Sequence, residues 1–241
     1  MIELGRRDGR LLRIGHRGAA ALAPENTLRS LATAVELGVD LVEFDVLDRP
    51  DGTLVLAHDR ERLHAEAVPT LAEALAFFAE EATGTGLQLD LKPRGHEHAL
   101  VEVLRRHGLV ERSLVSSFDA ASLRELALLE PGLRLGFTYP WDRRGLTRRR
   151  RLAPFVAATL LALRRALPRR IDGLLRRARA SVAVLHWAVV SHAAVERCHA
   201  AEAPVLVWTV NDPTLVARLD RLGVDGVITD DPHVFGDTLA L

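Results

Sequence analysis

The chain has 241 residues, of which 48% are hydrophobic and 27% charged, a composition sufficient for one globular domain with a full core. Its 32 basic residues balance its 32 acidic residues, so the molecule as a whole has no electrostatic attraction to nucleic acid. Cys198 is the only cysteine, which excludes an intramolecular disulfide and a cluster of thiolate metal ligands.

In chain order, short apolar runs rich in β-branched residues alternate with amphipathic helical stretches. This alternation predicts parallel strands joined by crossover helices, and eight such units in 241 residues are typical of a (β/α)8 barrel. We therefore expect an α/β fold with a single (β/α)8 domain over residues 1–241. The strands are predicted at 11–15, 40–46, 87–91, 113–118, 133–139, 181–187, 204–210 and 225–230, with helical patterns such as 26–38, 69–82 and 213–223 between them.

The turn after the first predicted strand bears on the choice of fold. An open doubly wound sheet is the alternative, and it requires a glycine-rich turn at this point. The sequence GHRGAA at 15–20 matches that turn poorly, which favours the barrel. For the helix that follows, Asn26 is the expected N-terminal cap and Thr27 is the alternative.

One segment breaks the regular alternation. Residues 142–179 contain 13 arginines and two acids, Asp142 and Asp172, so the segment carries a charge of +11 and the remaining chain −11. It includes LAPFVAATLLAL at 152–163, which is too short to span a bilayer, since a transmembrane helix needs about 20 residues. We expect a basic helical insertion over 142–179, between the fifth and sixth predicted strands.

Two interpretations of this basic segment stay open. It can be a solvated basic face of the protein. It can instead be an interfacial helix that contacts an anionic membrane, with arginines on the head groups. In the second case the residues facing the acyl chains would be Phe155, Val156, Leu160, Leu161 and Leu163.

The N-terminal sequence bears on localisation. MIELGRRDGRLLRIG lacks the long apolar segment that is typical of a signal peptide. We therefore expect a cytoplasmic protein, or one that binds a membrane peripherally. The oligomeric state does not follow from the sequence.

Three carboxylates end neighbouring predicted strands. Active sites of (β/α)8 barrels lie at the C-terminal ends of the strands, and the period of two places Glu43 and Asp45 on one face of the second strand. Asp90 lies at the end of the third predicted strand. Three carboxylates in a barrel mouth would repel one another unless a cation were bound, and oxygen ligands select Mg²⁺ or Ca²⁺. The sequence therefore predicts a site for a divalent cation.

Two histidines and two cations are expected at the same end of the barrel. His16 and Arg17 end the first strand, and His58 follows the extended run TLVLAHD. Histidines near such a site suit proton transfer near neutral pH. Arg17 and Lys92, the only lysine of the chain, would bind an anionic substrate. Together these residues are suited to metal-assisted phosphoryl transfer.

The motifs at these positions resemble those of a known family. HRG at 16–18, PENT at 24–27, E-x-D at 43–45 and HD at 58–59 occur in the order and spacing of the glycerophosphodiester phosphodiesterase signature. Later strand ends resemble the same family over most of the chain, with the exception of residues 140–180. They are LDLK (89–92), SSFD (116–119), VWTVN (207–211) and DGVITDDP (225–232).

This resemblance implies a (β/α)8 enzyme that uses a divalent metal to hydrolyse glycerophosphodiesters to glycerol 3-phosphate and an alcohol. In the family a glycerol hydroxyl is expected to attack the phosphorus, and water then opens the cyclic phosphate. By pattern alone Phe118 and Trp208 are core residues, and only the resemblance places them in the pocket. The implied roles are acid/base pair for His16 and His58, metal ligands for Glu43, Asp45 and Asp90, phosphate contacts for Arg17 and Lys92, and pocket lining for Phe118 and Trp208.

Two departures from the family pattern leave alternatives open. Asp90 stands where the family usually has glutamate, and the connection from His58 to PTLAEAL is short, which favours a bulky or membrane-presented substrate. The alternatives are a lysophospholipase D or another phospholipase of the same fold, and a catalytically inactive ligand-binding barrel. The head group and the identity of the metal do not follow from the sequence.

Overall fold

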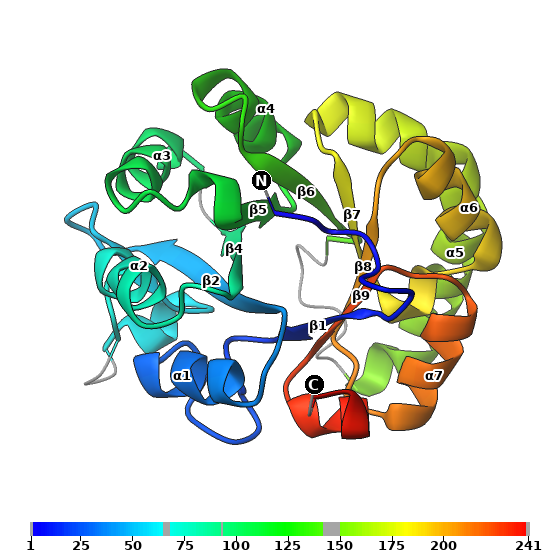
Figure 1. The fold of residues 1–241 in the computed structure, drawn as a ribbon. Helices are drawn as coiled ribbons and strands as arrows, with labels where there is room; N and C mark the ends of the chain where they lie inside the picture. Colours follow the sequence, from blue (N-terminus) through cyan, green and yellow to red (C-terminus); the bar gives the residue numbers. More distant parts are fainter. Residues whose placement is uncertain (1, 65–67, 93, 142–149, 240–241) are drawn as a thin grey trace.

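Eight parallel strands close into a barrel (Figure 1). The structure, a computed structural model, describes residues 2–64, 68–92, 94–141 and 150–239. The sheet has the strand order β1-β9-β8-β7-β6-β5-β4-β2-β3, and a further pairing between β1 and β2 closes the ring. This closure confirms the (β/α)8 barrel over the open doubly wound sheet.

Each predicted strand corresponds to one strand of the ring. These strands are β1 (Leu12–Gly15), β2 (Leu41–Asp48), β4 (Gly86–Leu91), β5 (Ser113–Ser117), β6 (Arg134–Tyr139), β7 (Val182–His186), β8 (Val205–Trp208) and β9 (Gly226–Thr229). The short β3 (Leu54–Leu56) pairs antiparallel with β2 outside the ring. The helices are α1 (Leu28–Glu36), α2 (Leu71–Glu80), α3 (Glu97–Arg106), α4 (Ala120–Leu129), α5 (Ala153–Ala178), α6 (His192–Ala200) and α7 (Pro213–Arg221).

The barrel interior is filled with aliphatic side chains. Because both faces of a parallel strand are covered, the strands read as nearly continuous apolar runs. Ile2 and Leu4 pack against the interior cluster, and the N-terminal segment that carries them runs across the front of the barrel in Figure 1. Trp208 packs against the same cluster from the C-terminal end of β8. The interior of the barrel is therefore a packed apolar core.

Helix α5 differs from the other barrel helices in length and burial. It has 26 residues, whereas the others have 9 or 10. Its buried residues all lie in its C-terminal half, and they are Leu167, Ile171, Leu175 and Ala178. The helix contains most of the predicted basic helical segment, of which 142–149 lies outside the described residues. Within the described chain, every helix is too short or too polar to cross a membrane.

Asp40 joins β1 to β2 at the N-terminal end of the barrel. Its buried carboxylate accepts hydrogen bonds from the backbone N–H of Arg13 (2.8 Å), from Arg13 Nε (3.0 Å) and from both terminal nitrogens of Arg10 (2.7 and 2.9 Å). Burial alone would raise the pKa of Asp40, but these hydrogen bonds outweigh it and lower the pKa from 3.8 to about 2. The ionised carboxylate therefore helps to hold β1 against β2, the pair of strands that closes the ring.

We expect Asp40→Asn to lower the free energy of unfolding by about 2 kcal/mol or more at pH 7, because the pKa shift corresponds to about that contribution. The folded-state pKa is depressed, so this stability is present above pH 4 and is lost as the pH falls from about 4 towards 2. Urea unfolding of both proteins at neutral and acidic pH measures it. The exposed Glu36→Gln is the control. If the difference in unfolding free energy between the wild type and Asp40→Asn stayed the same at acidic pH, the proposed contribution of the ionised carboxylate would be wrong.

Candidate active site

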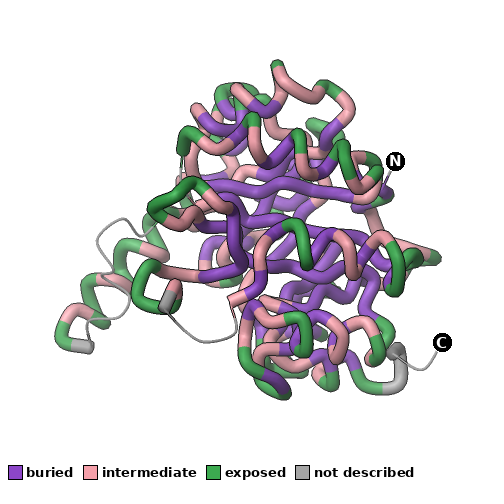
Figure 2. Tube along the Cα trace, turned by 90° about the vertical axis from the view of Figure 1, so that its left-hand side faces the viewer, coloured by how far each residue is buried: buried purple, intermediate pink, exposed green. Residues whose placement is uncertain are grey.

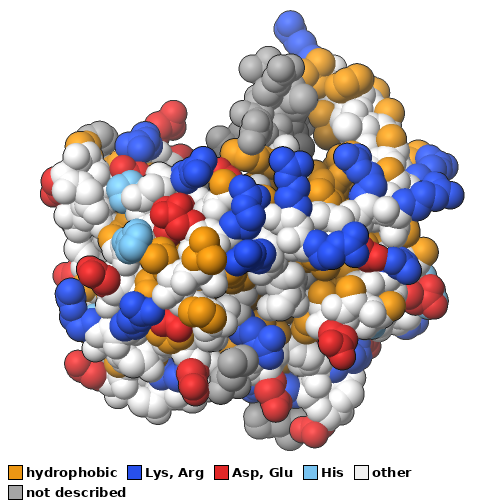
Figure 3. Space-filling model, turned by 90° about the horizontal axis from the view of Figure 1, so that it is seen from above, with side chains coloured by type: hydrophobic (Ala, Val, Ile, Leu, Met, Phe, Trp, Pro, Cys, Tyr) orange, Lys and Arg blue, Asp and Glu red, His pale blue; other side chains and the backbone are white. Residues whose placement is uncertain are grey.

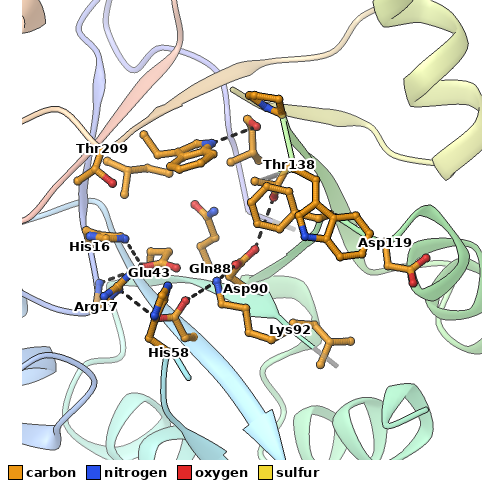
Figure 4. Close-up of a pocket in the computed structure, with 18 residues that line it drawn as sticks. His16, Arg17, Glu43, His58, Gln88, Asp90, Lys92, Asp119, Thr138 and Thr209 are labelled. Carbon is orange, nitrogen blue, oxygen red and sulfur yellow. Dashed lines mark hydrogen bonds and ion pairs between the residues drawn. The ribbon is translucent and has the colours of Figure 1, made fainter. Parts of the chain in front are cut away.

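A pocket of about 550 Å³ opens at the C-terminal ends of the strands. All nine predicted site residues line it: His16, Arg17, Glu43, Asp45, His58, Asp90, Lys92, Phe118 and Trp208. Figure 4 shows the labelled side chains of His16, Glu43, His58 and Asp90 pointing toward a common space. The structure thus brings together residues from six different segments of the chain.

The turn after β1 has a backbone shape that requires glycine. Arg17 and Gly18 both have left-handed backbone angles, with φ of 51° and 85°. A side chain on Gly18 would lie 2.4 Å from Ser30 in helix α1. The Arg17 N–H donates to Glu43 Oε2 at 2.9 Å, and the Arg17 carbonyl accepts from Ser30 Oγ at 2.9 Å. Gly18 thus permits the close packing that directs His16 and Arg17 into the pocket.

The three carboxylates meet because β2 and β4 pair in register. Asp45 lies directly opposite Asp90 in this parallel pair, and Glu43 lies two residues earlier on the same face of β2. All three are buried, and a ligand oxygen from each lies within 4.8 Å of the others. Among the described residues, this is the only group of three or more such side chains that could hold a metal ion.

Two cations offset part of this negative charge. Lys92 Nζ lies 2.7 Å from Asp45 Oδ1 and also contacts Asp90, while Arg17 Nε lies 3.0 Å from Asp45 Oδ2 without hydrogen-bond geometry. Burial would raise the pKa of Asp45, but Lys92 and Arg17 outweigh it and lower that pKa. Burial would lower the pKa of Lys92, and its two carboxylate partners raise it instead.

Glu43 has a different environment from Asp45. Burial, together with repulsion from Asp45 and Asp90, raises the pKa of Glu43, although His16 and Lys92 oppose the shift. The only side chain within 4 Å of the Glu43 carboxylate that can carry a positive charge, among the described residues, is His16, whose Nε2 lies 3.9 Å from Glu43 Oε2. The pocket therefore retains an excess of carboxylate charge beside Glu43, which a bound cation would relieve.

The pKa values of the two histidines are shifted in opposite directions. His16 Nδ1 hydrogen-bonds Asp230 Oδ1 at 2.6 Å, so its Nε2 faces the pocket. Burial would lower the pKa of His16, but Glu43 and Asp230 outweigh it and raise that pKa. His58 Nδ1 lies 3.3 Å from Asp59 Oδ2. Burial lowers the pKa of His58, and the positive charges of Arg17 and Lys92 add to the shift while Asp45 opposes it.

An aromatic wall faces the charged side of the pocket. Phe118 stacks on Trp141 with ring centroids 6.1 Å apart, and it meets Trp208 edge-on at 6.0 Å. Lys92 Nζ lies 6.0 Å from the centre of the Phe118 ring. The sequence analysis missed Trp141. It lies outside the segments that resemble the family, and the available signal was its position just beyond the C-terminal end of β6, where the strand-end rule places site residues.

Several supporting residues were also missed. Asn26 Nδ2 donates to Asp45 Oδ2 at 2.9 Å, and Asn26 Oδ1 accepts the Asp45 N–H at 3.0 Å. The expectation that Asn26 caps α1 is wrong, because Thr27 accepts the Ser30 N–H and is the cap. Asp230, which holds His16, immediately follows β9 and so obeys the same strand-end rule as the predicted residues.

The residues of the pocket fit a hard divalent cation. Glu43, Asp45 and Asp90 supply oxygen ligands only, which suits Mg²⁺ or Ca²⁺. Gln88 lies beside Glu43 in the strand register, and its buried Oε1 lacks a hydrogen-bond partner within the described residues. Figure 4 shows Gln88 between Glu43 and Asp90. A bound cation or a substrate hydroxyl would satisfy this oxygen.

A (β/α)8 barrel that gathers carboxylates, histidines and cations at its strand ends belongs to the class of barrel enzymes that act on anionic substrates. A family model described as the glycerophosphoryl diester phosphodiesterase family matches residues 16–71 and 60–234. The chain therefore belongs to this family of phosphoric diester hydrolases, as its motifs predicted.

Individual relatives agree with this assignment. The chain is similar to a glycerophosphodiester phosphodiesterase of Caldanaerobacter subterraneus subsp. tengcongensis, with 26% identity over 91% of this chain and 94% of the relative. A solved phosphodiesterase of Oleispira antarctica, in complex with the product sn-glycerol-3-phosphate, has 27% identity and a TM-score of 0.71 over 95% of this chain and 96% of that chain. A glycerophosphodiester phosphodiesterase structure from Parabacteroides distasonis shares the fold, with 24% identity and a TM-score of 0.75 over 95% and 97%.

We expect the metal-stripped protein to bind one divalent cation, measured by calorimetry with Mg²⁺ and with Ca²⁺. Glu43→Gln should abolish binding, and Asn26→Ala should weaken it about tenfold to a hundredfold because Asn26 orients Asp45. Asp48→Asn is the matched control, because Asp48 lies on the same strand but pairs with Arg60 and His96 instead. Equal affinities for the Glu43 variant and the control would rule out this metal site.

Proposed function

We propose that the protein hydrolyses glycerophosphodiesters to glycerol 3-phosphate and an alcohol, with a divalent cation bound by Glu43, Asp45 and Asp90. The observation that carries the proposal is the convergence of three buried carboxylates, two histidines and two cations in one pocket. The product bound to the Oleispira relative has the phosphate and glycerol parts that this pocket would need to hold.

The charged residues would bind the phosphate. Arg17 and Lys92 reach the pocket from different strands and both contact Asp45, so a phosphate beside the carboxylates meets two cations. When bound, the cation would polarise a phosphate oxygen and neutralise charge that develops during displacement. Arg17 is held in place by Glu25, whose Oε2 accepts from Arg17 Nη1 at 2.8 Å.

The two histidines would move the protons. One accepts the proton of the attacking glycerol hydroxyl, and the other donates a proton to the oxygen of the departing alcohol. When water opens the resulting cyclic phosphate, the roles exchange, so both groups return to their starting states. His16 is oriented for this work by Asp230, which in turn accepts a hydrogen bond from Asn211 at 2.5 Å.

The aromatic wall favours a second candidate within the same chemistry. Phe118, Trp141 and Trp208 give the pocket an apolar side next to its charged side. Such a side would accommodate the acyl chain that a lysophospholipid carries on its glycerol, while the head-group alcohol remains the leaving group. Identification of the products separates the possible reactions, because free choline without glycerophosphocholine means that the head-group bond was cut.

We expect the protein to release glycerol 3-phosphate from glycerophosphocholine in the presence of Mg²⁺ or Ca²⁺ and to lose this activity in EDTA. His16→Ala should lower kcat by about 10²- to 10⁴-fold, the usual loss for an acid/base group. His192→Ala, an exposed histidine on α6, is the control and should keep full activity. An enzyme whose turnover is unchanged by His16→Ala would refute the proposed role, and turnover absent under every cation would favour an inactive binding barrel.

Asp90→Glu tests whether the contacts of residue 90 with Ser116 and Lys92 require the shorter side chain of aspartate. Asp90 accepts from Ser116 Oγ at 2.9 Å and pairs with Lys92, and one added methylene would displace both contacts. We expect kcat/KM to fall about tenfold and the ratio of Mg²⁺- to Ca²⁺-supported activity to change. Asp90→Asn, which keeps the length and removes the charge, should lose more activity. Higher activity in the glutamate variant would show that these contacts do not require aspartate.

A further inference from the structure

Helix α5 extends well beyond the barrel. At about 1.5 Å per residue, its 16 additional residues relative to a 10-residue barrel helix correspond to roughly 24 Å. Its buried residues begin only at Leu167. Figure 2 shows exposed and half-buried turns projecting from the body on the side away from the N-terminus. Since helices of the barrel begin at the C-terminal ends of the strands, this projection rises on the pocket side of the molecule.

The projecting part, residues 152–163, is here called the arm. It carries no charged residue, and its largest exposed side chains are Phe155 and Leu161, with 62% and 47% of their surface accessible. Phe155, Ala158 and Ala162 follow helical spacing and are all exposed, so they form one outward apolar stripe. Figure 3 shows hydrophobic side chains along the projecting end.

Part of the arm is anchored to the barrel. Leu160 and Leu163 are half-buried and pack against the apolar cluster between the barrel and helices α5, α6 and α7. The expectation that these two leucines face acyl chains is therefore wrong. The exposed apolar surface is made by Phe155, Leu161 and the small residues beside them, on a helix whose orientation the two packed leucines help to fix.

An apolar groove continues this surface toward the active site. A cavity of about 260 Å³ lies between the arm, the short helix η5 (Trp187–Val189) and α7, with Leu161, Trp187 and Leu215 among its lining residues. Trp187 is 42% exposed and packs against His186, which in turn meets the pocket residue Trp208 at 5.0 Å. Apolar and aromatic groups thus connect the arm with the wall of the pocket.

Positive charge surrounds the arm. Arg151 precedes it, and Arg164, Arg165, Arg169 and Arg170 follow it. Within the described chain, these five arginines form no ion pair with an acidic side chain, and the one acid of α5, Asp172, pairs with Arg197. Figure 3 shows a band of basic side chains below the projecting end. The arm is therefore an exposed apolar surface, made by Phe155, Leu161 and the small residues beside them, and it is bordered by charge of one sign.

We propose that the arm docks the protein on an anionic lipid bilayer, with Phe155 and Leu161 inserted at the interface and the neighbouring arginines on lipid phosphates. An apolar stripe flanked by arginines is the chemistry that binds such a surface. A second copy of the chain fits less well, because in a twofold contact the same arginines would face one another. Docking would turn the pocket toward lysophospholipids in the membrane, and this consequence rests on the proposed function.

The test is co-sedimentation of the full chain with vesicles. We expect binding to vesicles that contain phosphatidylglycerol, little binding to pure phosphatidylcholine vesicles, and weaker binding in high salt because salt screens the arginines. Phe155→Ser/Leu161→Ser should reduce binding to anionic vesicles about tenfold or more. Leu128→Ser is the matched control, since Leu128 is 70% exposed but lies on α4.

Two results would overturn the proposal. One is wild-type protein that stays in the supernatant with anionic vesicles at low salt. The other is an oligomer, detected by sedimentation velocity, that the arm substitutions convert to monomers without any effect on vesicle binding. Glycerophosphocholine hydrolysis on the same samples separates this proposal from the proposed function, because the arm variant should retain it while cleavage of vesicle-bound lysophosphatidylcholine falls about tenfold.

Discussion

The mutual repulsion of three buried carboxylates is the interaction on which the site depends. Closure of the barrel and the in-register pairing of β2 and β4 place Asp45 opposite Asp90, with Glu43 beside them. Buried charges of one sign destabilise a fold unless they are paired or bind a cation. Lys92 and Arg17 both contact Asp45, so charge compensation is uneven and Glu43 is left with the least. The same imbalance that costs stability makes the pocket receptive to a cation.

The residues behind the site convert this electrostatic arrangement into fixed geometry. Asn26 holds Asp45 through two hydrogen bonds, Ser116 holds Asp90, and Asp230 sets which nitrogen of His16 faces the pocket. Each of these residues lies on or next to a different element of the barrel. The position of the reacting groups therefore depends on the closed ring as a whole, including the Asp40 contacts at its opposite end.

The parts of the structure that the sequence predicted depend on local patterns. Alternating apolar runs defined the eight strands, and the period of two together with the strand-end rule grouped Glu43, Asp45 and Asp90. The parts that were missed depend on contacts between distant segments. Asn26 and Thr27 are both good helix caps, and only the approach of β2 decides that Asn26 serves Asp45. Likewise, the apolar run at 152–163 does not reveal that Leu160 and Leu163 pack against the apolar cluster beneath α5, α6 and α7.

Lys92 is the only side-chain amine of the protein, and it lies between two carboxylates in the pocket. The other 31 of the 32 lysine and arginine side chains are arginines. Their guanidinium groups do not react with amine reagents. Reductive methylation with isotope-labelled formaldehyde would therefore label a single side chain, Lys92 in the pocket, besides any free N-terminal amine, and would leave the arginines around the arm unchanged. Lys92 is thus the single side-chain attachment point from which nuclear magnetic resonance can follow what enters the active site.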